Sequence, residues 1–494
     1  MSRRRIRVTG APGAPLRAAL AALRTAPGVP GGFPPEVLAE AERAARDPAL
    51  PLAALAGLEA LAARAPREDA TDVPFFTLTR PGATTLGRAV HLSRRGTGHR
   101  VRYAVADVAA FVVPSGPVDA ETHRRVITLC FPDGNVPLHP AVLGEGAASL
   151  LPGRTRPAVL WTLDLDADGR VLAVDLRRAL VRSRARLAPA EVQHAIDAGT
   201  AEEPLALLAE VGRLCEGLEA ERGGISLTLP EQEIAAYGSE YRVAYRVPPA
   251  VERRYAQLSL LPGMAAAELM LRQGTGVLRT LPAAPDGAVG RLRRTAHALR
   301  IDWPHHVSYA DLVRSLDPHR PPHAAFLQEC TTLLRGAGHT VFRDGRLPEL
   351  TTHAAVAAPY AHCTAPLHRL ADRYATEICL AAAAGQDPPD WVLAALDALP
   401  AEMAEGTRRA DAAEQDCLRA LEAALLADRT GDVFDACVID VEERHPTTGT
   451  VQLTSPPVVA PVESPGTPLP LGEDLRVRLT RADPVTATLR FTPA

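Results

Sequence analysis

Arginines are the residues of this chain best suited to bind an anionic ligand, because all 54 Lys and Arg positions are arginines. The candidates for contact with nucleic-acid phosphates are Arg94, Arg95, Arg182, Arg184, Arg186 and Arg373. Arg182, Arg184 and Arg186 alternate, so on a strand they would share one face. Phosphate contacts supply most of the sequence-independent affinity for nucleic acids. A solvated surface explains the same arginines equally well, so both interpretations stay open.

The composition indicates a globular protein and gives no global signal for nucleic acid. Hydrophobic residues make up 47% of the 494 positions and the net charge is −4, so only a local basic surface could carry such binding. The seven cysteines are scattered without a C-x-x-C pair, which favours reduced thiols. No apolar run reaches the roughly 18–20 residues that span a bilayer, and no signal peptide is evident. We therefore expect a cytoplasmic protein without a membrane partner.

A strand-rich region would position the arginines. Alternating apolar residues predict strands at Phe75–Leu78, Ala89–Ser93, Arg100–Phe111, Val159–Leu165 and Val171–Leu180. An irregular loop, Thr79–Arg88, joins the first two strands. Farther along, the patterns predict helices at Ala201–Arg222, Gln257–Leu271 and Ala404–Leu426, and a strand at Ile225–Glu233.

The two ends of the chain read differently. Residues 1–70 predict three helices, Pro15–Ala26, Glu36–Arg46 and Leu52–Ala63, which form either a packed cap or an RNA clamp. Residues 430–494 predict four short strands at Val433–Glu442, Thr450–Thr454, Leu475–Thr480 and Thr486–Phe491. This pattern suits a small five-stranded barrel crossed by a Pro-rich loop, Ser455–Pro470. We therefore expect domains at 1–70, 71–427 and 430–494.

One segment carries the most specific motif. Pro359–Ala381, PYAHCTAPLHRLADRYATEICLA, resembles the Tyr-Ala-x-x-Thr-Ser/Ala-Pro-Ile/Leu-Arg-Arg/Lys signature of the RNB domain, the core of the RNase II/RNase R family of exoribonucleases. The stretch ISLTLPEQE from Ile225 to Glu233 and the Leu-Gly-Glu-Gly segment from Leu143 are also similar to that family. The resemblance covers about residues 70–494. It implies a mixed α/β RNB core with an OB-type C-terminal barrel, single-stranded RNA as the ligand, and Mg²⁺-dependent 3′→5′ hydrolysis.

The loop Thr79–Arg88 departs from the family pattern. Where the family has metal-binding aspartates, this chain has Thr79, Thr85, Gly87 and Arg88. Two-metal hydrolysis needs Mg²⁺ ions held chiefly by carboxylates, and Arg88 places a permanent positive charge there instead. We therefore expect no metal site and no bound cofactor.

Three further positions follow from the resemblance. His368, followed by Arg369, stands where the family has an arginine that stabilises charge at the phosphate, and a histidine does this only when protonated. Pro189 stands where an aromatic residue often stacks on a base. Glu414 matches a glutamate of the last RNB helix.

Two hypotheses follow, and a third stays open. The first is an RNA-binding member of the family whose hydrolysis is lost or strongly impaired. The second is an active 3′→5′ exoribonuclease with displaced ligands, Asp72, Asp107 and Glu414. The third is a module that binds only protein. The sequence shows no sign of DNA specificity and identifies no protein partner.

Overall fold

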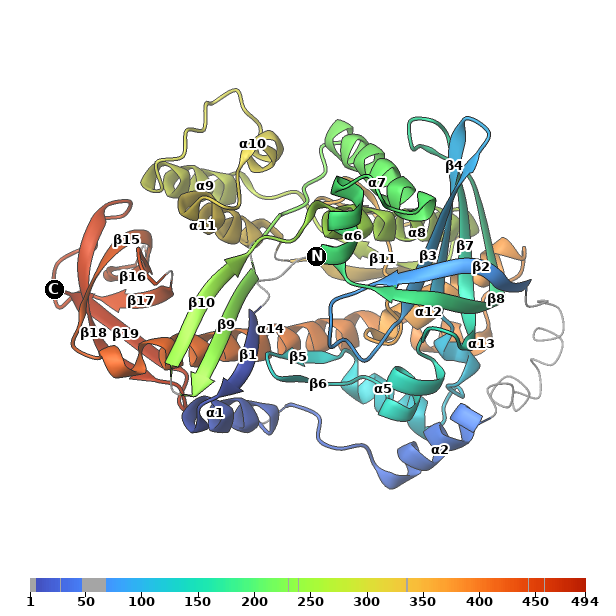
Figure 1. Ribbon diagram of the computed structural model, residues 1–494, viewed down its shortest axis with the longest axis horizontal. Helices are drawn as coiled ribbons and strands as arrows, with labels where there is room; N and C mark the ends of the chain where they lie inside the picture. Colours follow the sequence, from blue (N-terminus) through green and yellow to red (C-terminus); the bar gives the residue numbers. More distant parts are fainter. Residues whose placement is uncertain are drawn as a thin grey trace.

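The computed structural model describes residues 6–46 and 68–494, apart from residues 27, 230, 239, 335, 443 and 457. Figure 1 shows a strand-rich part on the right and a smaller C-terminal barrel on the left, with the long helix α14 (Leu399–Leu426) running between them. The mixed α/β class predicted from the sequence is confirmed. The predicted helix Leu52–Ala63 lies outside the described residues.

The strand-rich part is a closed barrel of order β2-β3-β4-β7-β8. Its strands are β2 (Glu68–Leu78), β3 (Arg88–Arg95), β4 (Gly98–Ala106), β7 (Thr155–Leu165) and β8 (Val171–Leu187). All five predicted strands exist, and the parallel pairing of β2 with β8 closes the barrel. β4 ends five residues earlier than predicted, because the chain turns after Ala106 into a short 3-10 helix at Val108–Ala110.

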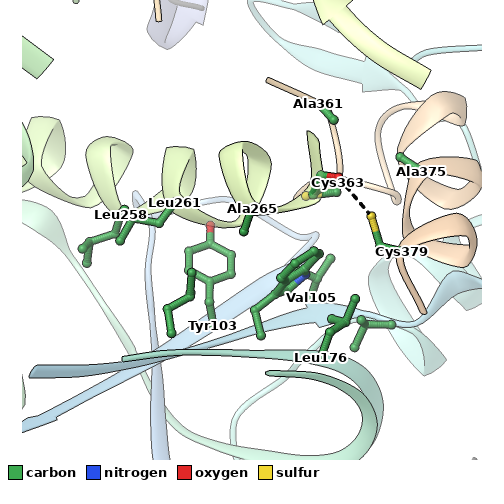
Figure 2. Close-up of a cluster of buried hydrophobic side chains, with 14 of the residues drawn as sticks. Tyr103, Val105, Leu176, Leu258, Leu261, Ala265, Ala361, Cys363, Ala375 and Cys379 are labelled. Carbon is green, nitrogen blue, oxygen red and sulfur yellow. Dashed lines mark hydrogen bonds between the residues drawn. The ribbon is translucent and has the colours of Figure 1, made fainter. Parts of the chain in front are cut away.

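Helices cover this barrel and form its core with it. They include α6 (Pro189–Asp197), α7 (Glu203–Glu221), α8 (Ala250–Gln273), α12 (Leu370–Ala383) and α13 (Asp390–Ala395). Figure 2 shows Tyr103 and Val105 of β4 pointing toward Leu261 and Ala265 of α8. Small residues allow the close approach of α8 to the chain before α12: a Cβ at Gly263 would lie 2.2 Å from the Tyr360 ring.

The N-terminal region is less purely helical than predicted. α1 (Ala14–Arg24) and α2 (Pro35–Arg46) confirm two of the predicted helices, but β1 (Ile6–Pro12) was not predicted. It pairs in parallel with β9 (Glu231–Gly238), which also pairs with β10 (Glu240–Arg246). The strand predicted at Ile225–Glu233 therefore begins only at Glu231.

Shorter elements complete the part between the two barrels. They are α5 (Pro117–Arg125), β5 (Leu129–Phe131), β6 (Gly134–Val136), β11 (Gly276–Thr280), α9 (Asp286–Ala298), α10 (Tyr309–Ser315), α11 (Pro321–Cys330), β12 (Gly338–Phe342), β13 (Thr352–His353) and β14 (Ala358–Pro359). In the described part of the chain, no helix combines the length and apolar character needed to cross a membrane.

The C-terminal barrel has the order β15-β16-β17-β19-β18. Its strands are β15 (Val433–Glu442), β16 (His445–Leu453), β17 (Val459–Glu463), β18 (Asp474–Asp483) and β19 (Thr488–Pro493). The prediction of a loop over Ser455–Pro470 is wrong at β17, because Ala460 and Val462 alternate into the barrel core while Pro461 faces solvent. Phe434 and Phe491 pack edge to face inside this core, with ring centroids 5.9 Å apart.

Candidate functional site

The loop between β2 and β3 is fixed by its backbone. The Thr79 amide donates to the Leu187 carbonyl at 3.0 Å, and the Gly87 carbonyl accepts from the Ala106 amide at 2.9 Å. Between them, the Leu86 amide donates to Ser149 Oγ at 2.8 Å. Backbone hydrogen bonds therefore hold the loop at Thr79, Leu86 and Gly87. They fix where the side chains of Thr79, Thr85 and Arg88 begin.

Two carboxylates contact this loop, and arginines bind both. Arg80 Nε donates to Glu252 Oε1 at 2.7 Å, and Arg80 also pairs with Glu231. Arg246 approaches the same carboxylates, at 3.2 Å from Glu231 and 3.4 Å from Glu252. The Arg80 carbonyl in turn accepts from Arg186 at 2.7 Å. This network ties the loop to α8 and to the β9–β10 hairpin.

Arg88 begins β3 and points its guanidinium at α8. Nη1 donates to Ser259 Oγ at 3.3 Å, and the guanidinium carbon lies 5.4 Å from the centre of the Tyr255 ring. Ser259 also bonds the Tyr103 hydroxyl at 2.8 Å. Tyr103 raises the pKa of Arg88 above its usual value, against the opposing effect of burial, and Tyr255 raises it further. Arg88 is thus a permanent, half-buried cation without an ion pair to Asp or Glu in the described chain.

The segment before α12 meets the loop directly. A Cβ at Gly87 would lie 3.6 Å from Leu367 Cδ1, so the two motifs singled out from the sequence are neighbours. Next to Leu367, Arg369 forms a two-point ion pair with Asp372, at 2.8 and 2.9 Å. Asp372 is fully buried and also accepts from the Ala365 amide at 2.7 Å.

His368 is close to this cluster but uncharged. Its Nδ1 lies 3.3 Å from Thr128 Oγ1. Burial, followed by the charges of Arg369 and Arg88, lowers the pKa of His368 to about 4. Since the sequence argument allowed phosphate stabilisation only by a protonated histidine, His368 does not supply that charge near neutral pH.

Three residues beside this cluster were not predicted from the sequence: His362, His339 and Arg279. His362, within the signature segment, has Nδ1 3.3 Å from His339 Nε2, and His339 Nδ1 lies 3.3 Å from Arg279 Nη1. Arg279 and His339 face each other across β11 and β12. Burial and nearby arginines lower the pKa of both histidines. His362 could have been noticed inside the motif, whereas the cross-strand pair has no local signal.

The proposed displaced metal ligands lie in different surroundings. Asp107 is buried and accepts from Arg178 Nε at 3.0 Å, and Arg178 also pairs with Glu377. Asp72 is exposed on β2. Glu414 lies on α14, close enough to Cys417 to affect the pKa of that thiol. Across the described chain, no three His, Cys, Asp or Glu side chains gather in a metal-binding group.

The residues at the loop do not fit Mg²⁺. The ion prefers oxygen ligands and binds proteins chiefly through carboxylates. The family positions offer two hydroxyls, a glycine and a guanidinium, and the two carboxylates in contact with the loop are already bound by Arg80 and Arg246. No step of metal chemistry can be built on this donor set.

Most of the candidate RNA-binding arginines lie on the surface. Arg182, Arg184 and Arg186 share the exposed face of β8, as the alternation predicted. Arg94 pairs with Glu210 at 3.0 Å, Arg95 with Asp164, and Arg184 with Glu202. The pairs of Arg94 and Arg184 are exposed and weak, whereas the Asp164 side chain is 10% exposed and also binds Arg100. Arg373 differs: it is 4% exposed and pairs with Asp119, so we leave it out of any binding surface.

A second basic region lies where α9 meets the C-terminal barrel. A hollow of about 370 Å³ is lined there by Arg293, Arg294, His297, Leu471 and Gly472. Arg293 stacks on Trp303, with its guanidinium carbon 4.2 Å from the ring centre. Arg294 and His297 are exposed. This hollow was not predicted from the sequence, because the residues on its two sides are more than 170 positions apart in the chain.

Comparison with known proteins matches both parts of the chain. The RNB domain model matches residues 67–383, and the model described as the RNase II-type exonuclease C-terminal S1 domain matches residues 432–494. Ribonuclease R of Escherichia coli K12 is 27% identical over 409 residues, covering 77% of this chain and 49% of that protein. The chain thus spans about half the length of this curated relative.

Two solved structures have a similar fold. RNase R of Mycoplasma genitalium, in complex with ribose-methylated single-stranded RNA, matches with a TM-score of 0.74 and 17% identity, over 87% of this chain and 72% of that chain. Yeast Ssd1, described as a pseudonuclease, matches with a TM-score of 0.63 and 15% identity, over 80% of this chain and 50% of that chain. At these identities the likeness shows the fold alone.

Proposed function

Because the chain belongs to the RNB-domain family, we propose that it binds single-stranded RNA without performing the family's metal-dependent 3′→5′ hydrolysis. The observation that carries this proposal is Arg88, a charged guanidinium without an ion pair to Asp or Glu in the described chain, at a family metal-ligand position. A cation there repels Mg²⁺ and attracts phosphate. The change therefore opposes hydrolysis and favours anion binding.

Two exposed surfaces support RNA binding. Arg182, Arg184 and Arg186 line one face of β8, and Arg186 reaches the loop through the Arg80 carbonyl. Arg293, Arg294 and His297 line the hollow beside the C-terminal barrel. The closely spaced cations on each surface would contact successive phosphates of the RNA. Phe434 and Phe491 are buried, so base stacking on them is not part of the proposal.

The alternative function is an active exoribonuclease with displaced metal ligands. The described contacts of the loop Thr79–Arg88 do not support it. It needs Asp72, Asp107 and Glu414 to converge on one metal site. Asp107 is instead neutralised by Arg178, and Asp72 is exposed.

The cysteines support a cytoplasmic location, which we include in the proposal. All seven lie in the described part of the chain, and none of them forms a disulfide there. Burial raises the pKa of the Cys215 and Cys330 thiols to about 12. Reduced, unreactive thiols of this kind are typical of a reducing compartment.

A paired assay on one labelled single-stranded RNA tests the proposal. We expect binding in EDTA at low salt, with a steep loss of affinity as salt rises, and no shortening of the RNA with Mg²⁺ or Mn²⁺. Metal-dependent release of nucleotides, abolished by EDTA, would favour the alternative. Absence of binding at low salt would favour a module that binds only protein.

Charge removal on β8 locates the surface. Replacing Arg182, Arg184 and Arg186 by Gln should weaken binding by about 10-fold or more and lower the salt dependence. Arg177→Gln is the control, because Arg177 is exposed on the same strand at an odd-numbered position and therefore lies on the opposite face from the three arginines. Equal effects of the two variants would place the RNA elsewhere.

A further inference from the structure

Arg88 is unusual because the described residues provide no carboxylate counterion for its charge. Its described neighbours are the Ser259 hydroxyl at 3.3 Å, the Tyr255 ring at 5.4 Å and Tyr103. Removing a cation from water without a paired anion is unfavourable, and a hydroxyl and a ring compensate for only part of that. The side chain remains partly accessible to solvent, so a ligand can supply the missing negative charge.

The groups around Arg88 are cationic or neutral donors. Together with burial, the charges of Arg369 and Arg88 lower the pKa of His368, and burial and the charge of Arg369 also lower the pKa of His362 and His339. A neutral histidine still donates one N–H. His368 and Arg369 are each partly exposed, and they directly follow Leu367, which lies against Gly87, the neighbour of Arg88 in the loop. We call Arg88, His368 and Arg369 the Arg88 cluster.

The carboxylate bonded within this cluster is already saturated. Both carboxylate oxygens of Asp372 accept hydrogen bonds from Arg369, and one of them also accepts from the Ala365 amide. Asp372 therefore balances Arg369 and leaves the charge of Arg88 without a partner. The cluster suits an anion that carries more than one negative charge and several acceptor oxygens.

We propose that the Arg88 cluster binds a phosphate monoester at the 3′ end of single-stranded RNA, without a metal ion. The inference rests on the proposed binding of single-stranded RNA and adds that the 3′ end of this RNA lies at the loop Thr79–Arg88. A terminal phosphate carries about −1.5 to −2 charge near neutral pH and three strong acceptor oxygens, whereas a phosphodiester carries one charge. The cluster therefore distinguishes RNA ends by charge: a 3′-phosphate binds more tightly than a 3′-hydroxyl.

Two oligonucleotides that differ only at the 3′ end test this inference. Fluorescence anisotropy in EDTA should give about tenfold tighter binding of the 3′-phosphate RNA to the wild type. Arg88→Gln should remove that preference, because the glutamine can keep a polar contact with Ser259 but carries no charge. Arg94→Gln is the control: Arg94 is exposed on the hairpin, so its loss should weaken both RNAs equally. Thermal melting checks that both variants fold.

Each outcome decides the inference. Equal affinity of the wild type for both RNAs overturns it while leaving RNA binding intact. So does a 3′-phosphate preference that survives in Arg88→Gln. Calorimetry with adenosine 3′-monophosphate, using adenosine as the control, separates the two proposals. Binding of adenosine 3′-monophosphate without binding of RNA supports the Arg88 cluster as a phosphate site and overturns the proposed function. If neither the nucleotide nor the RNA binds, both proposals are overturned.

Discussion

Two enclosed arginines of the first barrel, Arg178 on β8 and Arg88 on β3, have opposite surroundings. Arg178 contacts Asp107 and Glu377, and these side chains are 2% and 7% exposed. Although burial alone would lower the pKa of Arg178, Glu377 and Asp107 raise it. Arg88 has a hydroxyl and aromatic rings for neighbours instead. One barrel therefore holds a buried cation with two carboxylate partners and a partly buried cation with no carboxylate partner among the described residues.

The difference separates structural charge from charge that is available to a ligand. Transfer of an ion into a protein interior is unfavourable by several kcal/mol, and only close, well-bonded counterions restore that. Around Arg178, the chain provides two carboxylates from different elements. Around Arg88, it provides none in the described residues. We infer that Arg178 holds the barrel against α12, whereas Arg88 contributes little to folding.

The largest expected effect comes from breaking the Arg178 cluster. Arg178→Met leaves Asp107 and Glu377 buried without a cation, so the free energy of unfolding should fall by about 3–5 kcal/mol. Urea denaturation measures this. Arg177→Met is the control, because Arg177 is exposed, and it should change the free energy by less than about 0.5 kcal/mol. Similar small losses in both variants would show that Arg178 is not needed for stability, and its contrast with Arg88 would then be lost.

A smaller effect tests whether the Arg88 cluster keeps its histidine neutral. The pKa of His368 is lowered from 6.5 to about 4, mainly by burial. Between these values the unfolded chain binds more protons than the folded one, so stability falls as pH drops. The share of His368 in this loss is about 2 kcal/mol from pH 7 to pH 5. His368→Asn should therefore lose less stability over that range than the wild type, in parallel urea titrations. Equal losses would mean that His368 is charged in the folded protein.

Much of the fold could be predicted, because it depends on local patterns. The predicted bounds of β15, Val433–Glu442, match the structure, and the last helix of the core ends at Leu426 as predicted. β17 was missed because the Pro-rich stretch Ser455–Pro470 indicates a loop. The one proline within β17, Pro461, is exposed and is tolerated in the strand. β1 was missed because its partner, β9, lies more than 200 residues away in the sequence.

The candidate site was only partly predictable, for the same reason. The sequence identifies Arg88 as a cation in a loop without carboxylates. It does not show that Ser259 and Tyr255, about 170 residues later, receive the guanidinium. Likewise, the sequence does not show which of Arg369 and Arg373 faces inward; the structure places Arg369 at the N-cap of α12 and Arg373 within the helix. The structure buries Arg373 against Asp119. Long-range packing decides which arginines remain available.

The smallest expected effect on stability comes from Arg88 itself. Arg88→Met removes a 3.3 Å bond to Ser259 and a contact with Tyr255. It also removes an enclosed charge for which the described residues provide no carboxylate counterion. Ser259 keeps its bonds to the Tyr103 hydroxyl at 2.8 Å and to the Tyr255 carbonyl at 3.2 Å, so no polar group is orphaned. The free energy of unfolding should therefore change by less than about 1 kcal/mol, in either direction. A loss near that of Arg178→Met would show that Arg88, too, is needed for folding. Its charge would then no longer be evidence for a ligand.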